Sequence, residues 1–119
     1  MDDICRFREN DFGATVKGFT NIESGDEKAL QSTVATVGPI AVGVHAYRPF
    51  QFYRSGMMTT SVTYNHDVLV VGYGTENGQD YWLVKNSWGA FWGMGRYIKM
   101  SRNKNNQCAL TTDALYPLV

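Results

Sequence analysis

The chain has 119 residues, and its eleven basic and eleven acidic side chains cancel to a formal net charge of zero. Its composition is 44% hydrophobic and 18% charged, which is typical of a globular domain and excludes a disordered segment. A chain of this length builds one modest core, so we expect a single domain over residues 1–119. No basic stripe suggests a nucleic-acid partner, and no apolar run is long enough to span a membrane, so we expect neither.

The N-terminus and the two cysteines bear on processing and on the redox state of the protein. Residues 1–5 have no charged start followed by an apolar stretch, so we expect no signal peptide in this chain. Two interpretations of Cys5 and Cys108 stay open at this point. They are reduced core thiols of a cytosolic protein, or halves of disulfides whose partners lie elsewhere.

One helix is predicted near the start of the chain, after a strand within residues 12–22. Ser24 and Glu27 have the spacing of a capping box, which predicts the beginning of the helix. Gly38 and the proline that follows it predict the end. Apolar residues at i, i+4 and i+7 form the buried stripe of this helix: Leu30, Val34 and Val37.

The rest of the chain predicts sheet. Residues 47–64 are rich in loop formers, with a short aromatic turn at 50–53, and the polar, glycine-bounded stretch 74–79 indicates a hairpin. The expected strands are residues 40–46, 68–73, 81–84, 95–100 and 114–116. The predicted fold class is therefore α+β, mostly β: an antiparallel, barrel-like sheet with one helix.

A histidine and an asparagine flank two apolar runs. His66 precedes the first run, and Asn86 ends the second, so the two side chains can meet across a sheet. An amide oxygen there would hold the imidazole in one orientation and leave its other nitrogen facing a cleft, as in Cys–His nucleophilic sites. The alternative for any lone histidine is a structural role, which we assign to His45. Trp88, two residues after Asn86, is either a core aromatic or a shield that keeps water off the His–Asn hydrogen bond.

Gly72 and Gly74 do not form a nucleotide-binding loop, because a third glycine and a following helix are lacking. We expect no cofactor and no metal for this chain.

Two segments carry a specific resemblance to a known family. Residues 64–74 read YNHDVLVVGYG, and residues 81–89 read YWLVKNSWG. The chain resembles the C-terminal, right-hand domain of papain-like cysteine proteases, most of all those of the cathepsin L group. The resemblance implies a cysteine-type endopeptidase in which His66 is the general base, Asn86 its orienting partner and Trp88 the shield. It also implies that the nucleophilic cysteine belongs to a left-hand domain that precedes residue 1, so we expect the chain alone to be inactive.

The same resemblance gives expectations for the two cysteines. It pairs Cys5 with a cysteine of the left-hand domain. It places the partner of Cys108 shortly before the catalytic histidine, where residues 57–63 contain none. Neither cysteine stands in the sequence setting of the family's nucleophile.

A specificity pocket is also implied by the resemblance. Its expected lining positions are Gly43, Tyr64, Asp67 and Asp113. Asn65, which directly precedes the histidine, is expected to bind substrate with them. The family usually has Gly or Ala where this chain has Asp67. Two carboxylates there favour Arg or Lys at the substrate position two residues before the cut. The alternative is that both carboxylates point to solvent.

The resemblance implies peptide or protein substrates, the left-hand domain, and a prosegment or cystatin-like inhibitors as partners, and a lysosomal or secreted location. The first alternative is a non-catalytic, truncated homologue that binds peptides, prosegments or inhibitors. The second is a relative turned to another task, as in silica-forming sponge proteins with Ser in place of the nucleophilic Cys.

Overall fold

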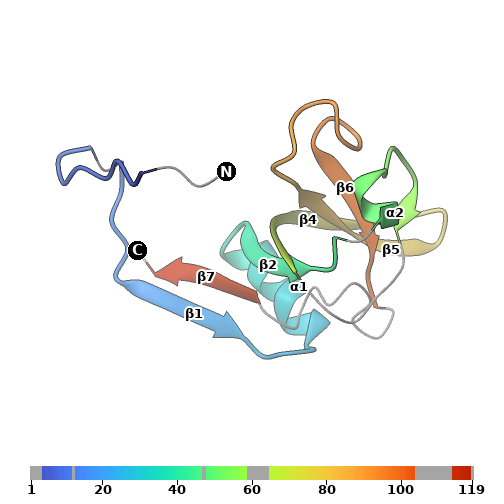
Figure 1. The fold of residues 1–119 in the computed structure, drawn as a ribbon. Coiled ribbons are helices and arrows are strands. Elements are labelled where there is room, and N and C mark those ends of the chain that lie inside the picture. Colours follow the sequence, from blue (N-terminus) through green and yellow to red (C-terminus); the bar gives the residue numbers. More distant parts are fainter. Residues whose placement is uncertain (1–3, 12, 47, 59–64, 104–113, 119) are drawn as a thin grey trace.

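The structure is a computed structural model, and it describes residues 4–11, 13–46, 48–58, 65–103 and 114–118. Figure 1 shows a sheet with one longer helix beside it and an N-terminal arm that leads into the first strand. The elements in chain order are β1 (Gly18–Ile22), α1 (Glu27–Thr36), β2 (Ile40–Val44), α2 (Arg48–Gln51), β3 (Met57–Met58), β4 (His66–Glu76), β5 (Gln79–Lys85), β6 (Tyr97–Ser101) and β7 (Ala114–Leu118).

The strands form one seven-stranded sheet in the order β1-β7-β2-β4-β5-β6-β3. Its pairs are antiparallel except for the short β3, which runs parallel to β6. The mostly β fold class is confirmed. The expectation of a barrel-like sheet needs correction, because among the described residues the edge strands β1 and β3 each pair on one side only, so the sheet is open.

Helix α1 begins later than the sequence pattern predicts. Its N-cap is Asp26, whose Oδ1 accepts a hydrogen bond from the Ala29 backbone N–H at 2.9 Å, so Ser24 as the N-cap is wrong. Gly25 has a φ of +82°, so the chain still turns there and the helix starts beyond it. Glu27 therefore does not close a capping box; its carboxylate accepts from Trp82 Nε1 at 3.3 Å.

The buried stripe of α1 is also shorter than predicted. Leu30 and Val34 lie in the core, but Val37 is the C-cap residue and is 54% exposed. The helix ends before Gly38, whose φ of +124° is unfavourable for other residues. A residue beyond the last helical turn no longer follows the helical spacing, so the prediction that Val37 belongs to the buried stripe is wrong.

Strands β4 and β5 form the predicted hairpin and carry the candidate site at their open end. Asn77 and Gly78 have φ angles of +51° and +74°, as the two central residues of a type I′ turn require. Both strands extend up to this turn, so they are longer than predicted. At the opposite end β4 begins at His66 and β5 ends one residue before Asn86.

A second helix and a short strand lie in the loop that follows β2. The expectation of one helix is therefore wrong: α2 occupies Arg48–Gln51, where the sequence predicted only an aromatic turn nearby. Pro49 suits the first turn of a helix, and the fully buried Phe50 anchors α2 to the core. Strand β3 has two residues and leaves no periodic signal in the sequence.

A buried arginine ties α1 to the β4–β5 hairpin. Arg102 is 7% exposed, and its guanidinium donates to Gln31 Oε1 at 2.8 Å and to the Gly74 carbonyl at 3.1 Å. Its Nε also donates to the Tyr81 carbonyl at 3.3 Å. Because these acceptors belong to three elements, the arginine fixes the hairpin against the helix.

Candidate active site

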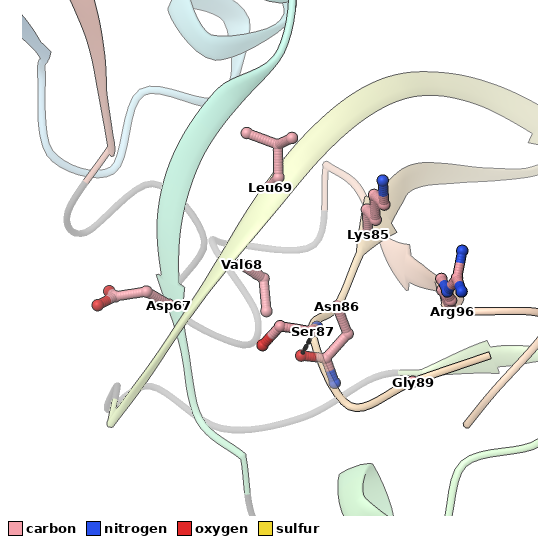
Figure 2. Close-up of a pocket in the computed structure, with 8 residues that line it drawn as sticks. All are labelled: Asp67, Val68, Leu69, Lys85, Asn86, Ser87, Gly89 and Arg96. Atoms are coloured by element: carbon pink, nitrogen blue, oxygen red, sulfur yellow. Dashed lines mark hydrogen bonds between the residues drawn. The ribbon is translucent and has the colours of Figure 1, made fainter. Parts of the chain in front are cut away.

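The structure brings His66 and Asn86 together. Nε2 of His66 lies 2.8 Å from Oδ1 of Asn86, across the gap between the start of β4 and the end of β5. The same Oδ1 accepts from the Ser87 backbone N–H at 2.8 Å, as Figure 2 shows. Because Oδ1 can only accept, Nε2 carries the proton, and in the neutral ring Nδ1 is left as the free basic nitrogen.

Trp88 covers one face of the imidazole. Its ring stacks on the His66 ring with centroids 4.7 Å apart and planes 26° from parallel. Trp88 is nevertheless 40% exposed, so it is not an ordinary core aromatic. Asn86, in contrast, is 4% exposed, which puts its hydrogen bond to His66 in a partly dry setting where it is stronger.

Phe50 supports both rings from inside the protein. It is fully buried and meets Trp88 edge-on at 5.6 Å and His66 at 6.4 Å between centroids. It also packs against Trp92 at 5.3 Å. Sequence reasoning did not assign this residue to the site; the signal was the aromatic run at residues 50–53.

Tyr53 continues the aromatic cluster away from the histidine. Its ring lies 5.9 Å from Trp92, and its hydroxyl donates to the Gly56 carbonyl at 2.6 Å. Burial raises the pKa of Tyr53, outweighing the opposite effects of Lys99, so the phenol stays neutral at physiological pH. Tyr53 is therefore a packing residue and no candidate acid or base.

Asp67 lies on the opposite face of β4 from His66, because successive residues of a strand alternate. Its backbone pairs with Gly43 of β2, which is buried, whereas Asp67 is exposed. Figure 2 shows the Asp67 carboxylate directed away from Asn86 and Ser87.

Asn65 closes the end of the β2–β4 ladder. Its backbone N–H donates to the Val44 carbonyl at 2.9 Å, and its Oδ1 accepts from the Ala46 N–H at 2.9 Å. This side chain therefore holds the backbone just before His66. The remaining predicted pocket residues, Tyr64 and Asp113, lie outside the described residues, as does Cys108.

A hollow of about 570 Å³ opens between the start of β4, the end of β5 and the loop before β6 (Figure 2). It reaches Asn86 but not His66, and Lys85 and Arg96 add positive charge to a mostly apolar wall. Within the described ranges, no group of three His, Cys, Asp or Glu side chains could hold a metal ion.

An imidazole that is fixed by an amide and covered by a tryptophan can act as the base of a nucleophilic hydrolase site when a nucleophile is supplied. Residues 1–118 match the family described as papain family cysteine protease, and the chain belongs to this family.

Cathepsin L-like proteins are among the matched relatives. The chain is 54% identical to digestive cysteine proteinase 2 of Homarus americanus over 99% of its own length and 38% of that protein. It is 50% identical to cathepsin L1 of Drosophila melanogaster over 100% of its own length and 34% of that protein. Its fold matches digestive procathepsin L 3 of Tenebrio molitor larval midgut with a TM-score of 0.95 at 42% identity, covering all of this chain and 40% of that one. The chain thus spans well under half the length of the curated relatives it matches.

Proposed function

We propose that this chain supplies the histidine and the asparagine of a Cys-His-Asn site in a cysteine-type endopeptidase. The observation that carries the proposal is the 2.8 Å contact between His66 Nε2 and Asn86 Oδ1, which leaves Nδ1 available to a thiol. The amide of Asn86 is neutral, so it orients the ring without adding negative charge. This suits a thiolate–imidazolium pair, in which the cysteine already carries the anion.

Each proton in the proposed reaction passes through His66. The thiolate attacks the peptide carbonyl carbon, and the imidazolium then protonates the departing amine as the C–N bond breaks. In the second half, neutral His66 takes a proton from water, whose oxygen attacks the thioester and releases the thiolate. Trp88 and Phe50 hold the ring in place through both halves by the contacts described above.

The nucleophile in this proposal comes from residues outside this chain. Cys5 is an exposed free cysteine on the arm before β1, and the sequence around it differs from that of the family's nucleophile. Asn86 Nδ2 is buried and meets no acceptor among the described residues. A buried donor without a partner is costly, which supports a site completed by further residues.

The proposed partners follow from the same reasoning. The open hollow beside Asn86 would take the left-hand domain, and the cleft so formed would take peptide or protein substrates, a prosegment or cystatin-like inhibitors. We further propose a lysosomal or secreted location. Within the described ranges, no helix has both the length and the apolar character needed to cross a bilayer.

We also propose that the Asp67 carboxylate makes the specificity pocket prefer Arg or Lys at the substrate position two residues before the cut. Asp67 is exposed beside the buried backbone of Gly43, so a substrate side chain that lies over Gly43 would meet its carboxylate. A guanidinium or ammonium group there would gain a charge-assisted hydrogen bond.

The experiment that tests both proposals is digestion of a peptide library by the full-length protein that contains residues 1–119. We expect hydrolysis that a thiol-alkylating reagent abolishes, with Arg or Lys preferred two residues before the cut. Asp67→Ala should reduce that preference about three- to tenfold, the range of a partly screened ion pair. Glu9→Ala, which removes an exposed carboxylate from the N-terminal arm, should leave it unchanged.

Other outcomes of this digestion separate the alternatives. A strict preference for Leu or Phe would contradict the proposal for Asp67 alone. Full-length protein that binds peptides but cleaves none would favour the non-catalytic alternative. We expect the polypeptide 1–119, assayed by itself, to show no hydrolysis, because His66 and Asn86 cannot replace the covalent route.

A further inference from the structure

Arg96 has an unusual backbone conformation for an arginine. Its φ is +84°, in the left-handed region that favours glycine, and the other non-glycine residues with positive φ in the described ranges are Asn77 and Asn103. Asparagine adopts this region readily, whereas a residue with a long side chain does so at a cost in free energy. Arg96 therefore carries backbone strain directly beside the candidate site.

The backbone of Arg96 is fixed by hydrogen bonds on both sides. Its carbonyl accepts from the Asn86 N–H at 2.9 Å, and its own N–H donates to the Trp92 carbonyl at 2.9 Å. Glycine could make the same bonds with less strain, because it has no Cβ and adopts positive φ readily. The backbone thus accounts for the conformation but not for an arginine, which needs an explanation from its side chain.

The Arg96 side chain lines the hollow beside Asn86, and this hollow is rich in hydrogen-bond donors. Lys85, which pairs across the sheet with the residue after Arg96, adds a second cation. Asn86 Nδ2 adds a donor that is buried and meets no acceptor in the described part of the chain. The Asp67 carboxylate lies across the hollow from both cations and points away from them (Figure 2).

The two cations are left to water within this chain. No salt bridge joins Lys85 or Arg96 to another described residue, and both are exposed. A domain that covers the hollow, as proposed above, would remove water from the guanidinium. Because a cation that is buried without a partner is strongly unfavourable, the surface that covers Arg96 has to present an anion.

We propose that Arg96 binds a carboxylate of the left-hand domain, from an Asp or Glu side chain that enters the hollow where the two domains pack together. A planar guanidinium can hold both oxygens of a carboxylate at once, and Lys85 adds to the attraction. The inference rests on the proposed function, because that function requires the left-hand domain. The ion pair across the interface would offset the backbone strain at Arg96.

Carbodiimide coupling in the full-length protein tests this contact directly. The reagent joins a lysine amine to a neighbouring carboxylate as an amide, so the test uses Arg96→Lys, which keeps the charge and adds a reactive amine. We expect mass spectrometry of the digested protein to find position 96 joined to an Asp or Glu outside residues 1–119. Arg54→Lys places the same amine at an exposed position away from the hollow and should give no such link.

Unfolding in urea measures how much the pair contributes. In the full-length protein, Arg96→Gln should unfold about three- to thirtyfold faster than the wild type, the range for loss of a charge-assisted hydrogen bond. Salt at about 0.5 M should reduce this difference, because salt screens an ion pair but not apolar packing. Arg96→Gly, which removes the strain as well as the charge, should unfold at a rate between the two. Arg54→Gln should unfold at the wild-type rate.

The outcomes separate this inference from the proposed function. Peptide hydrolysis by the wild type, with no link from position 96 to the left-hand domain, would overturn the role of Arg96 and leave the endopeptidase intact. A link to a prosegment, to a second copy of the protein or to a carboxylate within residues 1–119 would also overturn it. A link to the left-hand domain in a protein that hydrolyses no peptide would support the pairing and overturn the endopeptidase.

Discussion

Replacing His66 by alanine is expected to lower kcat for peptide hydrolysis by about 10⁴- to 10⁶-fold in the full-length protein. The imidazole carries the proton in both halves of the proposed reaction, and losses of this size follow when the base of such a site is removed. KM should change little, since His66 contributes to the transition state more than to ground-state binding. Steady-state kinetics on a peptide with a fluorogenic leaving group would measure both constants.

The chain offers a matched control for this substitution. His45 is the second histidine of the chain, and we assign it no part in the reaction. His45→Ala should keep kcat within about twofold of the wild type, as expected for a residue that does not touch the reacting atoms. A His66→Ala variant that is folded by circular dichroism and retains a tenth of the activity would rule out His66 as the base.

Phe50→Ala should have the largest effect on stability among the site residues. Truncation of a fully buried phenylalanine typically lowers the free energy of unfolding by about 3–5 kcal/mol, through lost transfer energy and the cavity left behind. Phe50 has no exposed surface and touches the rings of His66, Trp88 and Trp92. We therefore expect a clear drop in the urea midpoint together with lower activity.

Phe52 provides the comparison, because it lies two residues away and is 74% exposed. Phe52→Ala should change the free energy of unfolding by no more than about 0.5 kcal/mol. Phe50→Leu should restore much of the stability, yet activity should stay reduced if the edge-on contact with Trp88 positions the imidazole. Equal urea midpoints for Phe50→Ala and Phe52→Ala would show that Phe50 does not support the site.

The pairing of His66 with Asn86 could be anticipated because His66 stands at the start of one apolar run and Asn86 at the end of the next, and two neighbouring antiparallel strands bring these positions together. The hairpin between them was equally visible, since Asn77 and Gly78 accept the positive φ angles of a two-residue turn. Local chemistry thus determined the part of the fold on which the candidate site depends.

Other features depend on contacts that sequence spacing does not contain. Ser and Asp are both favourable N-cap residues, but the chain still turns at Gly25, so the helix begins after it and Asp26 is the N-cap instead of Ser24. Phe50 belongs to the candidate site because α2 places its ring against Trp88. The sequence could not predict this helix, because four residues are too few to show a helical pattern. The predicted roles of Tyr64 and Asp113 stay predictions, because both lie outside the described residues.

The measurement that tests the central claim most directly is mass-spectrometric mapping of a thiol-directed peptidyl epoxide on the full-length protein. The reagent reacts with an activated thiolate, which His66 is proposed to stabilise as its imidazolium partner. We predict one labelled cysteine, located outside residues 1–119, and at least a hundredfold slower labelling in His66→Ala, on the order of the loss of one charge-assisted pair. Labelling of Cys5 or Cys108, or an equal rate in both proteins, would contradict the account.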